Sequence, residues 1–437
     1  MEADPTLNES EALDFENEEQ IEVRFTTKLT DPALQVEDTP FFVPLRLARH
    51  GLSEIINSLL DLDPPRLFDF LINNQFLRTS LLTYVQQRNV NREETLAIEY
   101  TEVMPEPEHK QDLPHDDWVA CVAAGGNPYI VSGSFDQQAR LWNAEGECVA
   151  VLSGHTGPVK GVAWMSKPTA ESASFVTASQ DFSLFHWKVD TTNKTNEAIN
   201  KYVGHTGSVE CVAVEPTFER FCSGSWDHSI KLWYPNSTPA EEEKSEVKDI
   251  EIKKSAKKKA KVTAEVAKKG SIRTLLGHTL CVSSVAWPTP YNIYSGSWDH
   301  SLRQWDVETG IATRVMAGDK VVSSISYSTS VGLLASGHND KVVRIWDPRS
   351  SDAVVKDRLI SHKLWVSSVA WHPTSSLLLT GSHDGTIKVW DARSRIPLHT
   401  LPGQHKGKVL CVAWDGDRIV SGGADNVINI HKALGSA

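Results

Sequence analysis

Residues 223–233 read SGSWDHSIKLW, and residues 295–305 read SGSWDHSLRQW, which is nearly the same sequence. In both stretches, small polar residues lead to an Asp, and an alternating segment then ends in a Trp. Ser, Gly and Asp favour tight turns, whereas alternation of apolar and polar residues is typical of a strand with one buried face. Each stretch therefore predicts two strands joined by a turn, and the recurrence predicts a fold built from copies of this unit.

Seven copies of the unit follow one another from about residue 113 onward. The Asp of the turn stands at Asp136, Asp181, Asp227, Asp299, Asp340, Asp384 and Asp425. Successive Asp residues are 45, 46, 72, 41, 44 and 41 positions apart, so the period is about 40 to 45 residues with one longer interval. A period of this length, with several short strands in each copy, is typical of the blades of a β-propeller.

A His precedes this Asp by 20 to 26 residues in six units, and the fifth unit has Asp319 at that place. The order of His, Ser or Thr, Asp and Trp resembles the WD-repeat family, whose fold is a β-propeller of four-stranded blades. This resemblance covers about three quarters of the chain and implies a hydrogen-bonded tetrad within each complete unit. The candidate tetrads are His155, Thr177, Asp181 and Trp187; His205, Ser223, Asp227 and Trp233; His278, Ser295, Asp299 and Trp305; and His362, Thr380, Asp384 and Trp390.

Neighbouring His, Asp and Ser residues also suggest nucleophilic catalysis, but an enzyme uses such a triad once. A tetrad repeated in every unit is better explained by the need to pair buried polar groups. We expect it to be weakened where Asp319 replaces His and where His431 replaces the last Trp. Because the chain ends after the third strand of the seventh unit, residues around 104–113 are expected to supply the fourth strand and close a propeller that spans 104–435.

The long interval between Asp227 and Asp299 predicts an insertion at residues 236–271, after the third strand of the third blade. It has almost no large apolar residues, so we expect a disordered loop. Its basic cluster is typical of a nuclear-targeting signal or of a patch that contacts RNA phosphates, and a plain solvated loop is the alternative. The cluster consists of Lys253, Lys254, Lys257, Lys258, Lys259 and Lys261.

The N-terminal part of the chain is expected to form an acidic disordered tail (1–20) followed by a small α+β domain (21–103). The expected elements are strands at 21–25 and 41–45, a helix that begins near Ser53 with Ile55, Ile56, Leu59 and Leu60 on one face, strands at 68–72 and 76–77, a short helix capped by Thr79, and a strand at 96–103. This order is that of a ubiquitin-like fold. The fold class is therefore mainly β, with a seven-bladed propeller after a ubiquitin-like domain.

Composition narrows the possible functions further. The chain of 437 residues has a formal net charge of −12, which disfavours a generic nucleic-acid-binding surface. Its six Cys residues lack metal-ligand spacing and are expected to be reduced thiols in an intracellular protein. No phosphate loop, metal cluster or lone activated nucleophile is present, and no apolar run is long enough to span a membrane. We expect a protein without catalytic activity, without a cofactor of its own and without a membrane partner.

A ubiquitin-like domain joined to a WD propeller is similar to two ribosome-assembly families, Notchless and the WD-repeat subunit of the Pescadillo/Bop (PeBoW) complex. Notchless has eight blades, whereas GLSEIIN (51–57), FDFLI (68–72), LRTSL (77–81) and EYT (99–101) resemble the Pescadillo/Bop subunit closely. This resemblance implies a scaffold in 60S pre-ribosomal particles, located in the nucleolus and nucleoplasm and required for maturation of 25S/28S and 5.8S rRNA. It also implies docking on a Bop-type propeller, contact with Pescadillo through it, and rRNA as a further candidate partner.

The same resemblance implies that the ubiquitin-like domain engages Midasin, an AAA ATPase, for release from pre-ribosomes. Midasin's adhesion site binds Mg²⁺ and takes one carboxylate from its partner, because a hard divalent cation prefers oxygen ligands. The family places this acid on the loop before the last strand of the domain, which maps to Glu93, with Glu94 as the alternative ligand. An ordinary solvated loop is the competing interpretation.

A different class of function is a substrate receptor of a cullin-RING ubiquitin ligase. The stretches WDPR (346–349) and WDAR (390–393) match the ending that such receptors often show, although this ending is also common among WD blades. Co-purification distinguishes the two, because a receptor retains a cullin adaptor whereas an assembly factor retains rRNA precursors and a Bop-type protein.

Overall fold

The computed structural model describes residues 19–29, 31–91, 94–125, 129–193, 195–237, 266–350 and 355–433. The chain divides into two compact units, Met1–Pro105 and Glu106–Ala437, and each is described by itself. Within the described ranges, no helix has the length and apolar character needed to cross a membrane.

The first unit contains one mixed sheet of order β2-β1-β5-β3-β4, in which β1 and β5 are parallel and the other pairs are antiparallel. Its sheet and helices have the order of a ubiquitin-like fold. The elements are β1 (Gln20–Thr27), the 3-10 helix η1 (Pro32–Leu34), β2 (Phe41–Pro44), α2 (Arg49–Leu60), β3 (Phe68–Ile72), β4 (Gln75–Phe76), α3 (Leu81–Arg88) and β5 (Leu96–Glu102).

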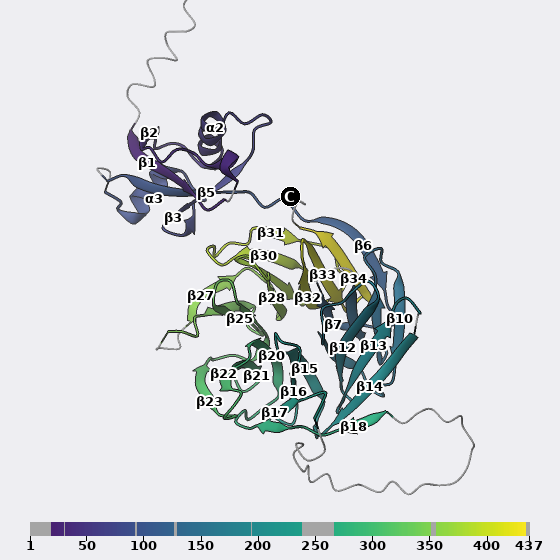
Figure 1. Ribbon diagram of the computed structural model, residues 1–437. Coiled ribbons are helices and arrows are strands. Elements are labelled where there is room, and N and C mark those ends of the chain that lie inside the picture. Colours follow the sequence, from purple (N-terminus) through teal and green to yellow (C-terminus); the bar gives the residue numbers. More distant parts are fainter. Residues whose placement is uncertain are drawn as a thin grey trace, which may run out of the picture. The chain divides into compact units, whose positions relative to one another are not determined.

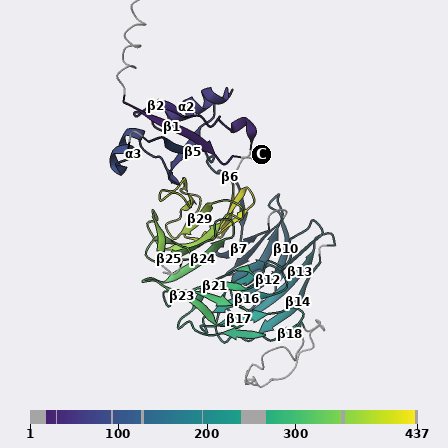
Figure 2. The ribbon, with the colours of Figure 1, turned by 60° about the vertical axis from the view of Figure 1, so that its left-hand side comes forward.

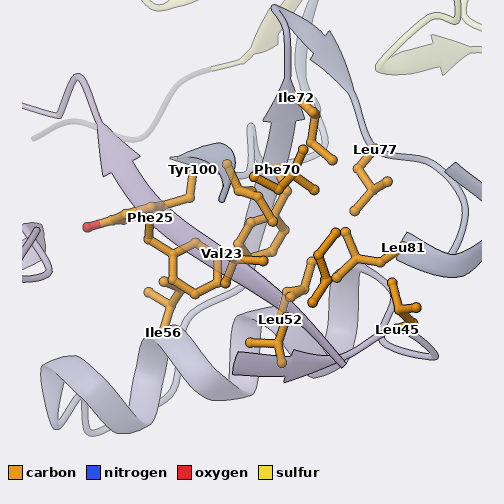
Figure 3. Close-up of a cluster of buried hydrophobic side chains, with 14 of the residues drawn as sticks. Val23, Phe25, Leu45, Leu52, Ile56, Phe70, Ile72, Leu77, Leu81 and Tyr100 are labelled. Carbon is orange, nitrogen blue, oxygen red and sulfur yellow. The ribbon is translucent and has the colours of Figure 1, made fainter. Parts of the chain in front are cut away.

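The core of this unit lies between the sheet and α2, where apolar side chains from both meet (Figure 3). Tyr100 of β5 is buried there, and its hydroxyl donates to the carbonyl of Leu34 at 2.7 Å and accepts from the N–H of Val36 at 2.8 Å. Burial raises the pKa of this phenol, and the hydrogen bond from Val36 opposes the rise only in part. Because a buried hydroxyl needs partners, these two bonds tie η1 to the sheet.

Both helices of this unit begin at residues other than those expected. Helix α2 begins at Arg49, about one turn before Ser53, which is buried and whose hydroxyl bonds the carbonyl of Arg49 and the N–H of Phe68. Leu59, expected on the buried face, is 48% exposed. Ser80 caps α3 in place of Thr79: its side chain accepts from the backbone N–H of Thr83.

The second unit is a β-propeller of seven blades, as expected, and Figure 1 shows the blades arranged around a common axis. Blade one holds β7 (Val119–Ala124), β8 (Ile130–Ser134), β9 (Gln138–Trp142) and β10 (Cys148–Ser153). Blade two holds β11 (Val159–Trp164), β12 (Ser172–Ser179), β13 (Ser183–Asp190), β14 (Thr195–Val203) and a fifth strand, β18 (Ala267–Lys269). Blade three holds β15 (Val209–Val214), β16 (Phe221–Ser225), β17 (Ile230–Trp233) and β19 (Arg273–Leu275).

The remaining four blades have four strands each. Blade four holds β20 (Val282–Thr289), β21 (Asn292–Ser297), β22 (Ser301–Asp306) and β23 (Ala312–Ala317). Blade five holds β24 (Val322–Ser328), β25 (Leu333–His338), β26 (Val342–Trp346) and β27 (Val355–Ile360). Blade six holds β28 (Val366–Trp371), β29 (Leu377–Ser382), β30 (Ile387–Asp391) and β31 (His399–Leu401). Blade seven holds β32 (Val409–Asp415), β33 (Arg418–Gly423), β34 (Val427–Lys432) and β6 (Glu108–Pro114).

The ring closes in blade seven through strands from the two ends of this unit. Strand β6 pairs antiparallel with β34, and Leu113 lies opposite Ile428 with both side chains buried. The expectation that residues near 104–113 supply the missing fourth strand is confirmed. Closure in this way pairs the strand that would otherwise expose an open sheet edge.

The insertion leaves blade three after β17 and returns before β19, as the spacing predicts. It is shorter than expected at its C-terminal end, because Ala267–Lys269 form β18, which pairs in parallel with residues 200–202 of β14 (Figure 2). The ammonium group of Lys269 donates to the carbonyl of Ser237 at 2.9 Å, so the two ends of the insertion lie close together. The intervening residues 238–265 lie outside the described residues.

Side chains on the innermost strands link neighbouring blades. Ser367 of blade six donates to the carbonyl of Val409 in blade seven at 2.6 Å and to its own blade at 3.0 Å. Ser or Cys takes the same place in five other blades, at Cys121, Cys211, Ser283, Ser323 and Cys411. Gly161 replaces it in blade two, where an added Cβ would lie 3.2 Å from the Cα of Cys211. The six Cys residues are free thiols.

Candidate functional site

The predicted tetrads form continuous hydrogen-bond chains, shown best in blade three. The indole N–H of Trp233 donates to Oγ of Ser223 at 2.8 Å, and Oγ lies 2.7 Å from Nε2 of His205. Nδ1 of His205 lies 2.7 Å from the carboxylate of Asp227. An indole only donates and a carboxylate only accepts, so the direction of every bond follows. The equivalent bonds are present in blades two, four and six.

The carboxylate of Asp227 also holds the surrounding turns. It accepts from the backbone N–H of Thr206 at 3.0 Å and from the hydroxyl of Ser229 at 2.6 Å. Burial raises the pKa of Asp227, but the hydrogen bonds from His205 and Ser229 outweigh it and hold the pKa well below its usual range. The hydroxyl of Ser223 is fully buried and has no access to a substrate, so the tetrad fixes the blade and offers no nucleophile.

Blades one and five have different hydrogen-bond partners at the positions of the tetrad. In blade five, His338 replaces the missing His: its Nε2 lies 2.7 Å from Oγ of Ser336. The expectation that Asp319 takes this place is wrong, because Asp319 is exposed. Asp340 pairs instead with Arg344 at 2.6 Å. Blade one follows the same plan, in which Asp136 pairs with Arg140 at 2.5 Å and His115 bonds Ser132 at 2.8 Å.

Two positions in the sequence distinguish these blades. The second residue after the Asp is Ser or Thr in the four blades with a complete tetrad, where its hydroxyl bonds the carboxylate. Blades one and five have Gln138 and Val342 there, and an Arg two residues later that neutralises the Asp. Blade seven keeps the bonds of His405 to Asp425 and Ser421, but His431 replaces Trp and its buried ring nitrogens have no partner among the described residues.

The acidic loop of the first unit connects α3 to β5. Helix α3 ends at Arg88, the following C-cap residue Asn89 lies in the left-handed region (φ 48°), and the N–H of Val90 bonds the carbonyl of Val85 at 3.1 Å. At the other end of the loop, the hydroxyl of Thr95 donates to the carboxylate of Glu22 on β1. Both ends of the loop are therefore fixed to the ubiquitin-like core.

The two candidate metal ligands on this loop are Glu93 and Glu94. Glu94 is exposed, and its Oε1 lies 3.5 Å from the side-chain amide of Asn91. Glu93 lies outside the described residues. Within the described ranges, no three His, Cys, Asp or Glu side chains gather as a metal site. An exposed carboxylate here can complete a site on another protein, where a hard cation has an open position.

The remaining predicted features are the lysine cluster of the insertion and the arginines of the WDPR and WDAR stretches. The six lysines of the insertion, from Lys253 to Lys261, lie outside the described residues. Arg349 and Arg393 each form a two-point ion pair with an Asp two residues earlier, Asp347 and Asp391, with the closest contacts at 2.9 Å. A partner that uses these guanidinium groups must compete with a carboxylate already bound.

Exposed aromatic residues on one face of the propeller were not recognised from the sequence. We call this the loop face: it carries the loop before the first strand of each blade and the turn between the second and third strands. Its exposed Trp residues are Trp118, Trp226, Trp298 and Trp365. A Trp in the turn or just before the first strand, rather than at the end of the unit, is the sequence signal that could have found them.

The described geometry defines a WD-repeat β-propeller protein with an N-terminal ubiquitin-like domain. Family models agree: the NLE (NUC135) domain matches residues 21–85, and the WD domain, G-beta repeat, matches seven segments between residues 108 and 432. The chain is 38% identical over 95% of its length to a protein of Oryza sativa subsp. japonica, 97% of which is covered. It is 39% identical over 94% of its length to a protein of Nematostella vectensis (99% covered), and 35% identical over 97% to one of Arabidopsis thaliana (99% covered). All three relatives are named ribosome biogenesis protein WDR12 homolog, and the chain belongs to this family.

Proposed function

We propose that this chain is a non-enzymatic scaffold in the assembly of the 60S ribosomal subunit, within the nucleolar and nucleoplasmic PeBoW complex. The observation that carries the proposal is the similarity along 94–97% of the chain to proteins named for ribosome biogenesis. In this role the chain is required for maturation of 25S/28S and 5.8S rRNA.

The propeller is the part that binds the other scaffold proteins. Its tetrads are buried and internally paired, which gives rigid blades and leaves the surface free for contacts. Exposed Trp side chains such as Trp118 and Trp226 support a protein partner, because aromatic residues are enriched in the centres of interfaces. The partner is a Bop-type WD-repeat protein, which also holds Pescadillo in the complex.

The ubiquitin-like domain serves as the point at which the Midasin AAA ATPase engages the particle for release. Support comes from the acidic loop, where Glu94 is exposed and the loop ends are fixed by Val90 and Thr95. Loop ends that are already held lose less conformational freedom when the exposed Glu94 side chain meets a partner. Glu93 supplies the oxygen that completes the partner's Mg²⁺ coordination, and Glu94 is the alternative.

Binding of the full-length chain to the Midasin adhesion domain in Mg²⁺ tests this assignment. Glu93→Ala is expected to abolish binding, and removal of Mg²⁺ with a chelator is expected to do the same. Glu54→Ala provides the control, because Glu54 is an exposed carboxylate on α2 of the same domain. Retained affinity in Glu93→Ala refutes that ligand, and retained affinity in the double variant with Glu94→Ala refutes the loop.

The scaffold role itself is tested by purification of the tagged chain from nuclear extract. Precursors of 25S/28S and 5.8S rRNA together with a Bop-type protein are the expected result. A cullin adaptor without rRNA precursors would contradict it and favour a ubiquitin-ligase receptor.

A further inference from the structure

A basic and aromatic patch lies on the loop face where blades six and seven meet. It consists of Lys363, Trp365, His383, Lys406 and Lys408, and we call it the blade 6/7 patch. The ring of Trp365 is stacked on that of His383, with centroids 5.7 Å apart and planes 20° apart. The backbone N–H of His383 donates to the carbonyl of Trp365 at 2.9 Å, which holds the two rings together. Trp365 is nevertheless 52% exposed.

The three lysines of the patch have no ion-pair partner in the part of the chain that the structure describes. The nearby carboxylates bind other groups. Asp384 accepts from the backbone N–H of Lys363 and bonds His362, and Asp425 accepts from the backbone N–H of Lys406. These carboxylates face the buried imidazoles of His362 and His405, whereas the three lysines are exposed to solvent. Two more exposed lysines, Lys320 and Lys341, lie on the loop face of blade five, where the exposed Asp319 is next to Lys320.

The charge of Lys408 acts on the imidazole of His383. The pKa of His383 is lowered by burial and by the charge of Lys408, so the stacked ring is neutral near pH 7. A neutral imidazole behind an exposed indole forms a flat platform, and positive charge surrounds this platform on blades six and seven.

Another aromatic pair on the same face lacks this chemistry. Trp226 and Trp298 lie 4.8 Å apart in blades three and four, but the indole N–H of Trp226 donates to the carboxylate of Glu210. That pair is next to a negative charge. An anionic ligand is therefore expected at blades six and seven and not at blades three and four.

We propose that the blade 6/7 patch binds single-stranded RNA, with Lys363, Lys406 and Lys408 on phosphates and a base stacked on Trp365. Lysine ammonium groups contact phosphates as point charges, and exposed aromatic rings stack bases in a sequence-tolerant manner. An acidic peptide would also bind the lysines, but its carboxylates do not stack on the exposed indole as a nucleobase does, so the aromatic platform favours RNA. The inference rests on the proposed function, since a pre-ribosomal particle is what brings RNA to this face.

The test uses the full-length chain and a labelled uridine oligomer of about twenty nucleotides, long enough to cover one stacking platform and its flanks. Because the lysines of the insertion can bind RNA too, all variants are compared in a chain in which Lys253, Lys254, Lys257, Lys258, Lys259 and Lys261 are Ala. Affinity is measured by fluorescence anisotropy between about 50 and 200 mM salt. Urea unfolding midpoints confirm that each variant is folded.

The triple variant Lys363→Ala, Lys406→Ala, Lys408→Ala is expected to reduce the slope of log affinity against log salt by about 2, at about 0.7 per phosphate contact. Trp365→Ala is expected to weaken binding about tenfold without changing this slope. Trp298→Ala is the matched control and should bind RNA as tightly as the parent chain that carries only the six insertion substitutions. An RNA affinity that survives the triple variant, or falls equally in Trp298→Ala, overturns the proposal.

A polyglutamate peptide separates RNA from an acidic protein segment. Lysine-dependent binding of the peptide without any dependence of RNA affinity on Trp365 overturns the RNA assignment. The proposed function has its own readout: if the triple variant loses RNA affinity as expected but the unsubstituted chain does not co-purify with 60S precursors, the scaffold role is refuted and the patch is not.

Discussion

Substitution of Ser223 by Ala tests the energetic role of the tetrads. The hydroxyl of Ser223 accepts from the indole of Trp233 at 2.8 Å and lies 2.7 Å from Nε2 of His205, and all three side chains are buried. The substitution leaves an indole N–H and an imidazole nitrogen without partners. Each buried polar group that loses its partner costs about 1–3 kcal/mol, so the free energy of unfolding should fall by about 2–6 kcal/mol.

Blade seven offers a matched control. Ser421 is equally buried and bonds Nε2 of His405 at 2.8 Å, but His431 stands where the other blades have Trp. Ser421→Ala therefore leaves one nitrogen unpartnered instead of two, at a cost of about 1–3 kcal/mol. The two substitutions remove the same atom from the same strand position, so the difference between them isolates the indole bond.

Equilibrium unfolding in urea, followed by far-UV circular dichroism, measures both variants. The account requires Ser223→Ala to be the more destabilised by about 1–3 kcal/mol, with unchanged denaturant slopes. Equal losses in the two variants would refute the reasoning, because the Trp233 bond would then contribute nothing.

Three further predictions follow from single contacts. Hydrogen bonds from His and hydroxyl groups hold the pKa values of four buried carboxyls below the usual range, although burial raises them: Asp181, Asp227, Asp299 and Asp384. The stability that these carboxylates contribute is therefore present above about pH 4 and is lost as the pH falls below it. Circular dichroism from pH 7 to 2 should show that Asp227→Asn is less stable at pH 7 and less sensitive to acid. Ser367→Ala removes a bond between blades six and seven and should cost about 1 kcal/mol in urea, and an unchanged midpoint would contradict a linking role. Leu113→Ala, at the closure strand, should cost about 2–5 kcal/mol, more than Leu276→Ala at a position that is 74% exposed.

The fold was predictable because its signals are repeated. Seven Asp residues at a near-constant spacing define the blades, and the missing strand after His431 requires closure by residues near Leu113, as the structure has it. The residues at which helices begin were less predictable. The helix was expected to begin near Ser53, but Ser53 lies inside α2 and its hydroxyl bonds the N–H of Phe68, a contact that exists only when β3 packs on α2.

The hydrogen bonds and extra strands of individual blades could be predicted only in part from the sequence. His338 sits inside a strand next to Ser336, and nothing in the spacing indicates that its ring turns back to replace the absent His. Strand β18 was missed because it is short, rich in Lys and stabilised by pairing with β14, which is distant in sequence. The loop-face residue Trp365 was overlooked because propeller Trp residues at the end of a unit are buried, and only its place before a strand separates it from them.

Sedimentation of the chain in a nuclear extract tests the central claim most directly. The account predicts that the chain sediments with particles of pre-60S size that contain precursors of 25S/28S and 5.8S rRNA. Sedimentation in light fractions only, free of these precursors, would contradict a scaffold role in assembly of the 60S subunit.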